Sequence, residues 1–485
     1  MGSAILSIDA GTTNVRALII GIDGRIKGQA MIAQALRYPD AGLAEMDPEE
    51  LWLATQQTIK QALIQAGLSV QDLTAVGITG QRTTTIVWDR KSGIAIGPGI
   101  SWQDMRGSTR ANELLAQGFF VSAICASSKL ESVIDAIPDG RSRMMRGELA
   151  WGNVDSFLAW KLSGGSVHAT DCSHACTTGY YDTFIGQWDR RLIELQGLNI
   201  SLFPEIRDTS DIIGLTDRKV LGVEIPIGAI IGDQQSAAYA QGCLKPGEGK
   251  VTYGTSATCN VNTGSDIILN SLDAGIFPLV LWRRNGETTF CLEGMVITAG
   301  AVFSWLQRGL KLPKNTSDAA DVGASVPDSH GVFFLPALQG LGSPHGQAKS
   351  FGVISGLTLG VTDAHIVRAA MEGVAFRVRE MIDRVYKDSS LPRPTHLRVD
   401  GGAASNDVLM QIQANVLGCT VERMMPLEAT GFGAALLAGE ACGIWPKWGT
   451  GNIRQTSRIF EPDWSQEMRD GRFEEWRVAC KHSGV

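Results

Sequence analysis

The stretch Ile-Ile-Gly-Asp-Gln-Gln-Ser-Ala-Ala-Tyr-Ala at residues 230–240 joins an apolar run to a segment of helix-forming composition. This pattern predicts a buried strand that ends at Gly232 and a helix over the following residues, with Asp233 between them. Ligands bind at this edge in open α/β sheets. The stretch therefore predicts a ligand site around Asp233, near the middle of the chain.

A glycine turn follows closely, in the run Gly-Lys-Val-Thr-Tyr-Gly-Thr-Ser at residues 249–256. Residues 251–253 are rich in β-formers, and Gly254 breaks the run where the backbone can turn sharply and present N–H groups to an anion. An acid and an anion-binding turn so close together indicate phosphoryl transfer.

Length and composition bound the class of protein. A chain of 485 residues is too long for one ordinary core, so we expect two domains, at residues 1–245 and 246–485. The net charge is −7 and no basic block occurs, so neither a nucleic acid nor a membrane is expected as a partner. No apolar run has the length of a membrane span and no leader precedes the first strand, which favours a cytoplasmic protein. The sequence leaves open whether the chain forms a homo-oligomer.

The nine cysteines are odd in number and include no Cys-x-x-Cys pair, which favours reduced thiols over a disulfide framework. His168, Cys172, His174 and Cys176 lie close together in the sequence. Their spacing is not that of a common zinc site, so we do not expect a metal there.

Residues 4–20 predict a strand, a glycine turn and a second strand. Backbone N–H groups of the turn, with Thr12 or Thr13, can hold phosphate oxygens, while Asp9 can hold Mg²⁺ through water. An ordinary Asp/Gly/Thr turn is the alternative. The turn at 253–256 repeats the pattern between β-rich runs, and two related folds facing one another across a cleft would place both turns on one nucleotide. This internal echo favours the phosphate interpretation.

Polar residues follow the buried strand predicted at 75–79. Arg82 lies at the strand end, where its guanidinium can bind sugar hydroxyls or a phosphate, the alternative being a surface arginine paired with an acid. Trp102 lies among polar neighbours at 101–106, an arrangement typical of sugar sites, where a ring packs against C–H faces. Both residues are candidates for acceptor binding.

Several helices are expected further along. Residues 107–165 are predicted to be mainly helical, including 149–162. We expect a strand at 397–400, a turn at the glycines 401–402 and a helix from Asp407. A strand followed by a glycine turn and a helix N-terminus predicts a nucleotide-binding edge. The small residues at 430–435 open one more helix, which we expect to pack closely.

Six motifs, in order over nearly the whole chain, resemble those of the FGGY carbohydrate kinases, and most closely those members that phosphorylate glycerol. They are Asp-Ala-Gly-Thr-Thr-Asn-Val-Arg at 9–16, Gly-Gln-Arg-Thr-Thr-Thr at 80–85, Trp-Gln-Asp-Met-Arg at 102–106, Gly-Asp-Gln-Gln at 232–235, Thr-Tyr-Gly-Thr-Ser at 252–256 and Val-Asp-Gly-Gly-Ala at 399–403. The resemblance implies a two-domain α/β fold of the actin and hexokinase (ribonuclease H-like) type, with ATP and a polyol or sugar in the cleft. The first domain would bind the acceptor and phosphates and the second the nucleotide.

The resemblance also implies roles for individual residues. Asp233 would be the general base that takes the proton of the acceptor hydroxyl, and Asp9 would help position Mg²⁺. The acceptor would be faced by Arg82, Trp102, Asp233 and Gln234. ATP would be bound by Thr12, Thr13, Arg16, Gly254 and Thr255, with Gly300, Gly402 and Asn406 bordering the nucleoside.

Three positions depart from the members that phosphorylate glycerol. Those members typically carry Glu after the arginine, where this chain has the substrate-facing Thr83, and they carry Tyr and Phe where this chain has Ile124 and Thr258. The pocket thus lacks the Glu carboxylate, which would accept hydrogen bonds, and two aromatic rings. These losses predict a wider pocket, and hence a polyol or ketose of about four or five carbons as substrate. Glycerol remains an alternative, because Gln234 after the base is typical of its kinases.

The same fold also serves proteins that sense sugar or ATP without catalysis, which is the competing hypothesis. A sensor is expected to have lost its base or to carry a DNA-binding extension. This chain keeps Asp9, Asp233 and both Gly-Thr turns, so the sequence favours an enzyme.

Overall fold

The computed structural model describes residues 3–313, 315, 318–347, 349–425, 428–447 and 455–481. The chain divides into two compact units, each assembled from segments that are distant in the sequence. Unit 1 comprises Met1–Ala240, Leu279–Thr289 and Thr430–Ile453, and unit 2 comprises Gln241–Pro278, Phe290–Ala429 and Arg454–Val485. Both units draw on residues from either side of position 245, and the division of the sequence at that position stays a prediction.

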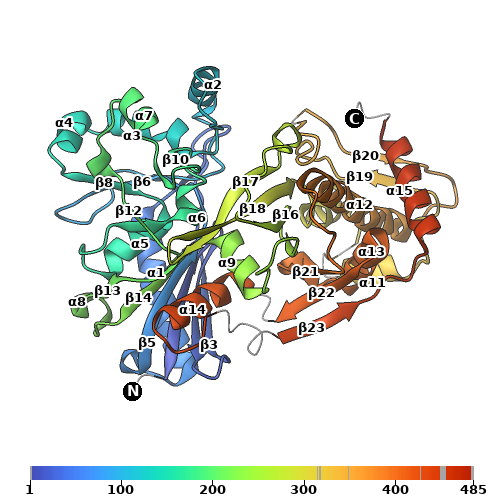
Figure 1. Cartoon of the computed structure of the whole chain (residues 1–485). Coiled ribbons are helices and arrows are strands. Elements are labelled where there is room, and N and C mark those ends of the chain that lie inside the picture. Colours follow the sequence, from blue (N-terminus) through green and yellow to red (C-terminus); the bar gives the residue numbers. More distant parts are fainter. Residues whose placement is uncertain are drawn as a thin grey trace. The chain divides into compact units, whose positions relative to one another are not determined.

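Unit 1 is built on a six-stranded sheet (Figure 1). In sheet order its strands are β13 (Ser210–Leu215), β14 (Pro226–Gly232), β5 (Leu73–Gly80), β1 (Ala4–Ala10), β2 (Asn14–Gly21) and β3 (Ile26–Ala33). β5 pairs in parallel with β1 on one side and with β14 on the other, while the outer pairs are antiparallel. The carboxyl ends of β1, β5 and β14 therefore lie side by side at one edge, and the strands predicted from the sequence are confirmed.

Unit 2 contains most of a seven-stranded sheet, the tip of its first hairpin being counted with unit 1. In sheet order its strands are β17 (Phe277–Arg284), β18 (Glu287–Val296), β16 (Ala257–Gly264), β15 (Gly249–Tyr253), β21 (His396–Asp400), β22 (Thr420–Met425) and β23 (Gln455–Phe460). β15 pairs antiparallel with β16 and parallel with β21, and β21 pairs in parallel with β22.

The two sheets share one pattern of neighbours. β1, β2, β3, β5, β14 and β13 correspond in position and direction to β15, β16, β18, β21, β22 and β23. The turn at residues 11–13 follows β1, and the turn at 254–256 follows β15. The two Gly-Thr turns that are similar in sequence therefore occupy equivalent loops of the two sheets.

Helices and short strand pairs complete each unit. The helices of unit 1 are α1 (Pro48–Ala66), α2 (Ser108–Ala116), α3 (Leu130–Ala136), α4 (Gly140–Met145), α5 (Val154–Leu162), α6 (Cys172–Ala175), α7 (Arg190–Leu195), α8 (Arg218–Leu221), α9 (Asp233–Ala240) and nearly all of α14 (Ala429–Ala441). Those of unit 2 are α10 (Ala301–Trp305), α11 (Ala319–Ala324), α12 (Asp363–Ser389), α13 (Asp407–Leu417) and α15 (Gln466–Cys480). The short strand pairs are β4 (Glu45–Met46) with β7 (Gly99–Ile100), β6 (Ile86–Asp89) with β8 (Leu149–Gly152), β9 (Ala169–Asp171) with β12 (Glu205–Arg207), β10 (Tyr181–Asp182) with β11 (Gln187–Trp188), and β19 (Phe333–Leu335) with β20 (Val353–Ser355). Within the described segments, no helix is long and apolar enough to cross a membrane.

The prediction of one helix over residues 149–162 is wrong in its first part. Residues 149–152 form β8, which pairs antiparallel with β6, and α5 begins only at Val154. Every residue of β8 is buried, and hydrophobic periodicity does not distinguish a short buried strand from a buried helical segment. The pairing partner, some 60 residues earlier in the sequence, decides the conformation.

α14 packs against the sheet of unit 1, although it follows β22 in the chain (Figure 1). The hydroxyl of Ser7 in β1 donates to the carbonyl of Gly431 at 2.6 Å. A Cβ at Gly77 in β5 would collide with the carbonyl oxygen of Ala434, and a Cβ at Gly433 would collide with that of Ser236. The close packing predicted for the small residues at 430–435 is confirmed.

We expect Gly77→Ala to destabilise the protein, because the new methyl group must push α14 away from β5. Overpacking of this kind typically costs about 1–3 kcal/mol of unfolding free energy. Gly471→Ala is the matched control, since a Cβ at this position in α15 meets nothing within 4 Å. That control should gain about 0.5–1 kcal/mol from helix propensity. Urea denaturation of both variants measures the effect, and equal stability of the two would contradict the packing argument.

Candidate active site

The predicted catalytic and acceptor residues of unit 1 gather at the ends of neighbouring strands. Asp9 is the penultimate residue of β1, Arg82 follows β5, and Asp233 follows β14. These three strands are adjacent and parallel, so their carboxyl ends meet at one edge of the sheet. This is the edge at which open α/β sheets bind ligands.

Asp233 begins α9 and faces Arg82. Oδ1 of Asp233 lies 3.3 Å from Nε of Arg82 and accepts the backbone N–H of Gln234 at 2.7 Å. The side chains are 28% and 15% exposed, so the carboxylate stays accessible while the guanidinium is mostly covered. The sequence left open whether Arg82 pairs with an acid. It does, and that acid is the predicted base.

The absence of a side chain at Gly232 leaves space for Arg82 and Gln235 where β14 meets α9. A Cβ at this residue would lie 2.7 Å from Oε1 of Gln235 and 2.9 Å from Cδ of Arg82. Nε2 of Gln235 donates to the carbonyl of Val280 at 3.2 Å, which fixes the first turn of the helix. The close approach of Arg82 to the backbone therefore depends on the missing side chain.

The loop between β1 and β2 is in contact with Trp102. Nε1 of Trp102 donates to the hydroxyl of Thr12 at 3.0 Å, and that hydroxyl lies 3.3 Å from Oε1 of Gln81. Thr13 accepts a hydrogen bond from the Asn14 side chain at 2.9 Å. Trp102, a candidate for binding the substrate, is thus hydrogen-bonded to Thr12, a candidate for binding phosphate.

Asp9 and Arg16 are register partners in the β1–β2 pair. Oδ2 of Asp9 lies 3.9 Å from Nη1 of Arg16, and the Asp9 side chain is 9% exposed while that of Arg16 is 36% exposed. The arrangement keeps a mostly buried carboxylate beside a more exposed guanidinium.

Thr83 has an unusual backbone conformation. Its φ is 61°, in the left-handed region, and the residue is 4% exposed. A β-branched residue rarely adopts this conformation, and strain of this kind persists where the surroundings impose it, often at functional sites. The structure therefore holds Thr83 in place directly after Arg82.

Lys129 is a residue of this region that the sequence did not reveal. It is fully buried, and its Nζ donates to the carbonyls of Ser101 at 3.0 Å and Ile124 at 3.4 Å. It thus ties the segment that carries Trp102 to the segment that carries Ile124. Burial lowers the pKa of Lys129 to about 8, while Asp104 opposes the shift. Lys129 directly precedes α3, whose composition is mixed, so no local pattern in the sequence marks this lysine as buried.

The predicted nucleotide residues of unit 2 also come together. The N–H of Gly300 donates to the carbonyl of Gly254 at 3.0 Å, and the N–H of Ala299 donates to the carbonyl of Thr255 at 2.9 Å. A Cβ at Gly300 would collide with the carbonyl oxygen of Gly254. The turn after β15 and the start of α10 therefore form one continuous backbone surface.

The glycine turn after β21 adjoins the same place. Gly401 has φ +87°, and a Cβ there would lie 2.5 Å from the carbonyl oxygen of Tyr253. A Cβ at Gly402 would meet nothing within 4 Å, so packing does not explain this glycine. Asn406 caps α13, its Oδ1 accepting the N–H of Leu409 at 3.0 Å. The bare backbone at Gly402 leaves room for a ligand to approach.

The His and Cys residues at 168–176 serve the interior of unit 1. His168 contacts Nη2 of Arg90 at 3.0 Å and the carbonyl of Trp151 at 2.9 Å, and burial lowers its pKa to about 4. Across the residues that the structure describes, no group of three or more His, Cys, Asp or Glu side chains is arranged to hold a metal ion.

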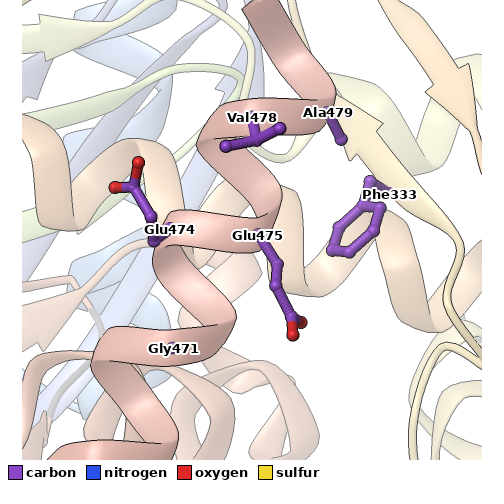
Figure 2. Close-up of a pocket in the computed structure, with 6 residues that line it drawn as sticks. All are labelled: Phe333, Gly471, Glu474, Glu475, Val478 and Ala479. Atoms are coloured by element: carbon purple, nitrogen blue, oxygen red, sulfur yellow. The ribbon is translucent and has the colours of Figure 1, made fainter.

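A pocket of about 790 Å³ lies elsewhere, in unit 2 (Figure 2). It is lined by Phe333 of β19 and by five residues of α15, namely Gly471, Glu474, Glu475, Val478 and Ala479. None of the predicted site residues contributes to it. This pocket is therefore separate from the candidate site at the strand ends.

Comparison with known proteins gives a consistent result. Models of the FGGY family of carbohydrate kinases match the chain with their N-terminal domain over residues 4–240 and their C-terminal domain over residues 249–442. The chain is 40% identical to a glycerol kinase of Aromatoleum aromaticum, covering 99% of both chains, and 36% identical to glycerol kinase 2 of Thermotoga maritima, covering 99% of this chain and 98% of the relative.

Comparison with solved structures points to the same family as comparison of the sequences. The crystal structure of Plasmodium falciparum glycerol kinase with ADP superposes with a TM-score of 0.92 at 28% sequence identity, covering 99% of this chain and 98% of that one. The predicted two-domain α/β fold is confirmed.

We expect the stability of the protein to depend on pH through Lys129. Its pKa of about 8 in the folded state lies below the ordinary value of 10.5, so between these values the unfolded state binds more protons. The unfolding free energy should therefore rise with pH in this window relative to Lys129→Met, by at most about 1.4 kcal/mol per pH unit. Urea denaturation of both proteins at pH 7 to 10 measures the difference, and a constant difference would show that the ammonium is not desolvated.

Proposed function

The chain belongs to the FGGY family of carbohydrate kinases, and we propose that it transfers the γ-phosphate of ATP to a hydroxyl of a small polyol or sugar. The observation that carries the proposal is the accessible carboxylate of Asp233 at a sheet edge, 3.3 Å from Arg82. A base next to a fixed hydrogen-bond donor can hold an acceptor hydroxyl and remove its proton.

Asp233 acts as the general base. Phosphoryl transfer needs little covalent chemistry from the protein, so positioning and neutralised phosphate oxygens supply most of the rate. The Oδ1 contacts with Gln234 and Arg82 orient the carboxylate. As the acceptor oxygen attacks the γ-phosphorus, Asp233 takes the hydroxyl proton.

The acceptor is bound by Arg82, Thr83, Trp102 and Gln234 together with the base. The hydrogen bond from Trp102 to Thr12 fixes the indole, so its ring offers a defined apolar face to the carbon skeleton. Arg82 and Gln234 supply donors for the other hydroxyls.

The residues proposed for ATP binding lie in loops of unit 1 and in loops of unit 2. We assign the phosphates to Thr12, Thr13, Arg16, Gly254 and Thr255, and the nucleoside to Gly300, Gly402 and Asn406. Because the Thr12 hydroxyl is occupied by Trp102 and Gln81, backbone N–H groups of that turn are the donors assigned to phosphate oxygens. The ADP named with the Plasmodium falciparum structure supports a nucleotide ligand.

Mg²⁺ fits the residues at the end of β1. Asp9 offers a carboxylate that is 9% exposed, and Mg²⁺ keeps several waters and needs only one or two protein carboxylates. When bound, the ion neutralises charge on the phosphate oxygens. Arg16, 3.9 Å from Asp9, adds a positive charge at the same place.

The departures at Thr83, Ile124 and Thr258 bear on the acceptor. Ile124 is 43% exposed, and Thr83 carries a hydroxyl where the glycerol-phosphorylating members carry the carboxylate of Glu. We therefore propose a polyol or ketose of about four or five carbons as the best acceptor, with glycerol as the alternative supported by the names of the relatives. The cytoplasm, where ATP is available, is the proposed location.

The competing hypothesis of a non-catalytic sensor has no support from the comparisons, because the relatives are named as kinases. The structure also keeps the Asp233 carboxylate accessible beside Arg82.

We expect Asp233→Asn to lower kcat by about 10²- to 10⁴-fold, because an amide of the same shape cannot take the proton. The KM for ATP should stay near the wild-type value. Asp211→Asn is the control, since this carboxylate pairs with Arg207 and is 40% exposed. ATP consumption coupled to ADP detection measures both, and an Asp233→Asn enzyme with kcat near that of the control would remove Asp233 from the mechanism.

The acceptor is tested with a panel of glycerol, erythritol, ribitol, dihydroxyacetone and both enantiomers of ribulose and xylulose. We expect a four- or five-carbon compound to give the highest kcat/KM. Thr83→Glu should shift the ratio of kcat/KM values toward glycerol by about 10- to 100-fold, because it restores an acceptor for hydroxyls beside Arg82. If the unmodified enzyme has its highest kcat/KM with glycerol, the inference of a wider acceptor pocket is wrong.

A further inference from the structure

The backbone directly before Asp233 is held by a side chain from a distant segment. The N–H of Gly232 donates to the hydroxyl oxygen of Ser173 at 2.8 Å. Both residues are buried, Ser173 completely. This hydrogen bond joins the last residue of β14 to α6, which lies some 60 residues earlier in the sequence.

Ser173 is itself fixed by a buried carboxylate. Its hydroxyl donates to Oδ1 of Asp171 at 2.8 Å. Oδ1 also accepts the N–H of His174 at 3.0 Å, and Oδ2 accepts the hydroxyl of Thr209 at 2.7 Å. Burial raises the pKa of Asp171, and its contacts with His174, Thr209 and Ser173 oppose that shift.

The direction of these hydrogen bonds follows from the chemistry of the groups. A carboxyl oxygen without a proton only accepts, so Oδ1 of Asp171 takes the single O–H of Ser173. The lone pairs of that hydroxyl are then left for the N–H of Gly232. The N–H of Gly232, the hydroxyl of Ser173 and the carboxyl group of Asp171 form a cooperative chain, in which each hydrogen bond is stronger than it would be alone.

The junction has little freedom to adopt another position. A Cβ at Gly232 would lie within 3 Å of the Arg82 and Gln235 side chains, which would have to move to make room for it. Loss of the Ser173 acceptor would leave a buried N–H without a partner, and the free-energy cost of such a group favours a backbone shift that restores a hydrogen bond. A shift at Gly232 moves Asp233, which is the next residue.

We propose that Ser173 is a positioning residue which, through Gly232, holds the carboxylate of Asp233 in its catalytic position beside Arg82. This inference rests on the proposed function, in which Asp233 is the base. Displacement of a reacting group by about 1 Å can lower the rate on the order of 100-fold, so a constraint on the base has a measurable kinetic effect.

The test compares Ser173→Ala with Thr170→Val in the full-length protein. Thr170 is 2% exposed and its hydroxyl donates to Asp155 at 2.6 Å, so the control also deletes a buried hydroxyl bonded to a carboxylate. Steady-state kinetics give kcat and both KM values, and hydrogen–deuterium exchange reports on residues 226–240. Thermal denaturation gives the stability of each variant.

Ser173→Ala should lower kcat by about 10- to 100-fold with the KM for ATP unchanged, and should speed exchange in 226–240. Thr170→Val should lose stability without either change, and Ser173→Thr, which keeps the hydroxyl, should recover most of the lost kcat. Equal kcat for Ser173→Ala and Thr170→Val would overturn the proposal. If Ser173→Ala does not fold, Ser173→Cys decides, because a thiol of similar size is a poor acceptor; wild-type kcat in that variant would also overturn it.

Failure of the proposed function has a different signature. If the wild-type protein turns over no acceptor, the kinase assignment fails, and the exchange data alone judge whether Ser173 holds the junction. Equal rates of hydrogen–deuterium exchange over 226–240 in Ser173→Ala and Thr170→Val would then show that Ser173 does not hold the junction.

Discussion

The parallel pairing of β5 with β1 on one side and β14 on the other is the constraint on which unit 1 depends. These backbone hydrogen bonds end three strands at one edge of the sheet, and each strand delivers one polar residue there. Asp9, Arg82 and Asp233 are far apart in the sequence, and the sheet alone brings them to one edge. Unit 2 repeats the pairing with β21 between β15 and β22, and its glycine turns follow two of those strands.

Much of this arrangement could be predicted because it is local. Adjacent residues determine each of the features that were predicted. These features are the glycine turns after β-rich runs, the acid between an apolar strand and a helix, and the capped helix at 407–417. The residues that the sequence missed act over long distances. Ser173 reaches Gly232, and Lys129 reaches Ser101, through hydrogen bonds that no local pattern encodes. The same limit explains β8, whose conformation is decided by β6.

Burial separates the polar residues that fix the backbone from those proposed to act on the acceptor. Asp171, Ser173 and Lys129 are completely or almost completely inaccessible to solvent, and each makes hydrogen bonds that fix a segment of backbone. Asp233 and Arg82 keep part of their surface exposed. A rigid interior that holds a few accessible groups is what preorganised catalysis requires, because the reacting groups then need little reorganisation.

The position of α14 has a consequence for how the protein is made. This helix completes the packing of unit 1 against Gly77, yet it is encoded after nearly all of unit 2. During synthesis from the N-terminus, the sheet of unit 1 emerges long before residues 430–441 do, so its partner surface stays uncovered while unit 2 is being translated. The first half of the chain therefore cannot complete its packing before residues 430–441 emerge, and a protein shortened before these residues would lose part of unit 1.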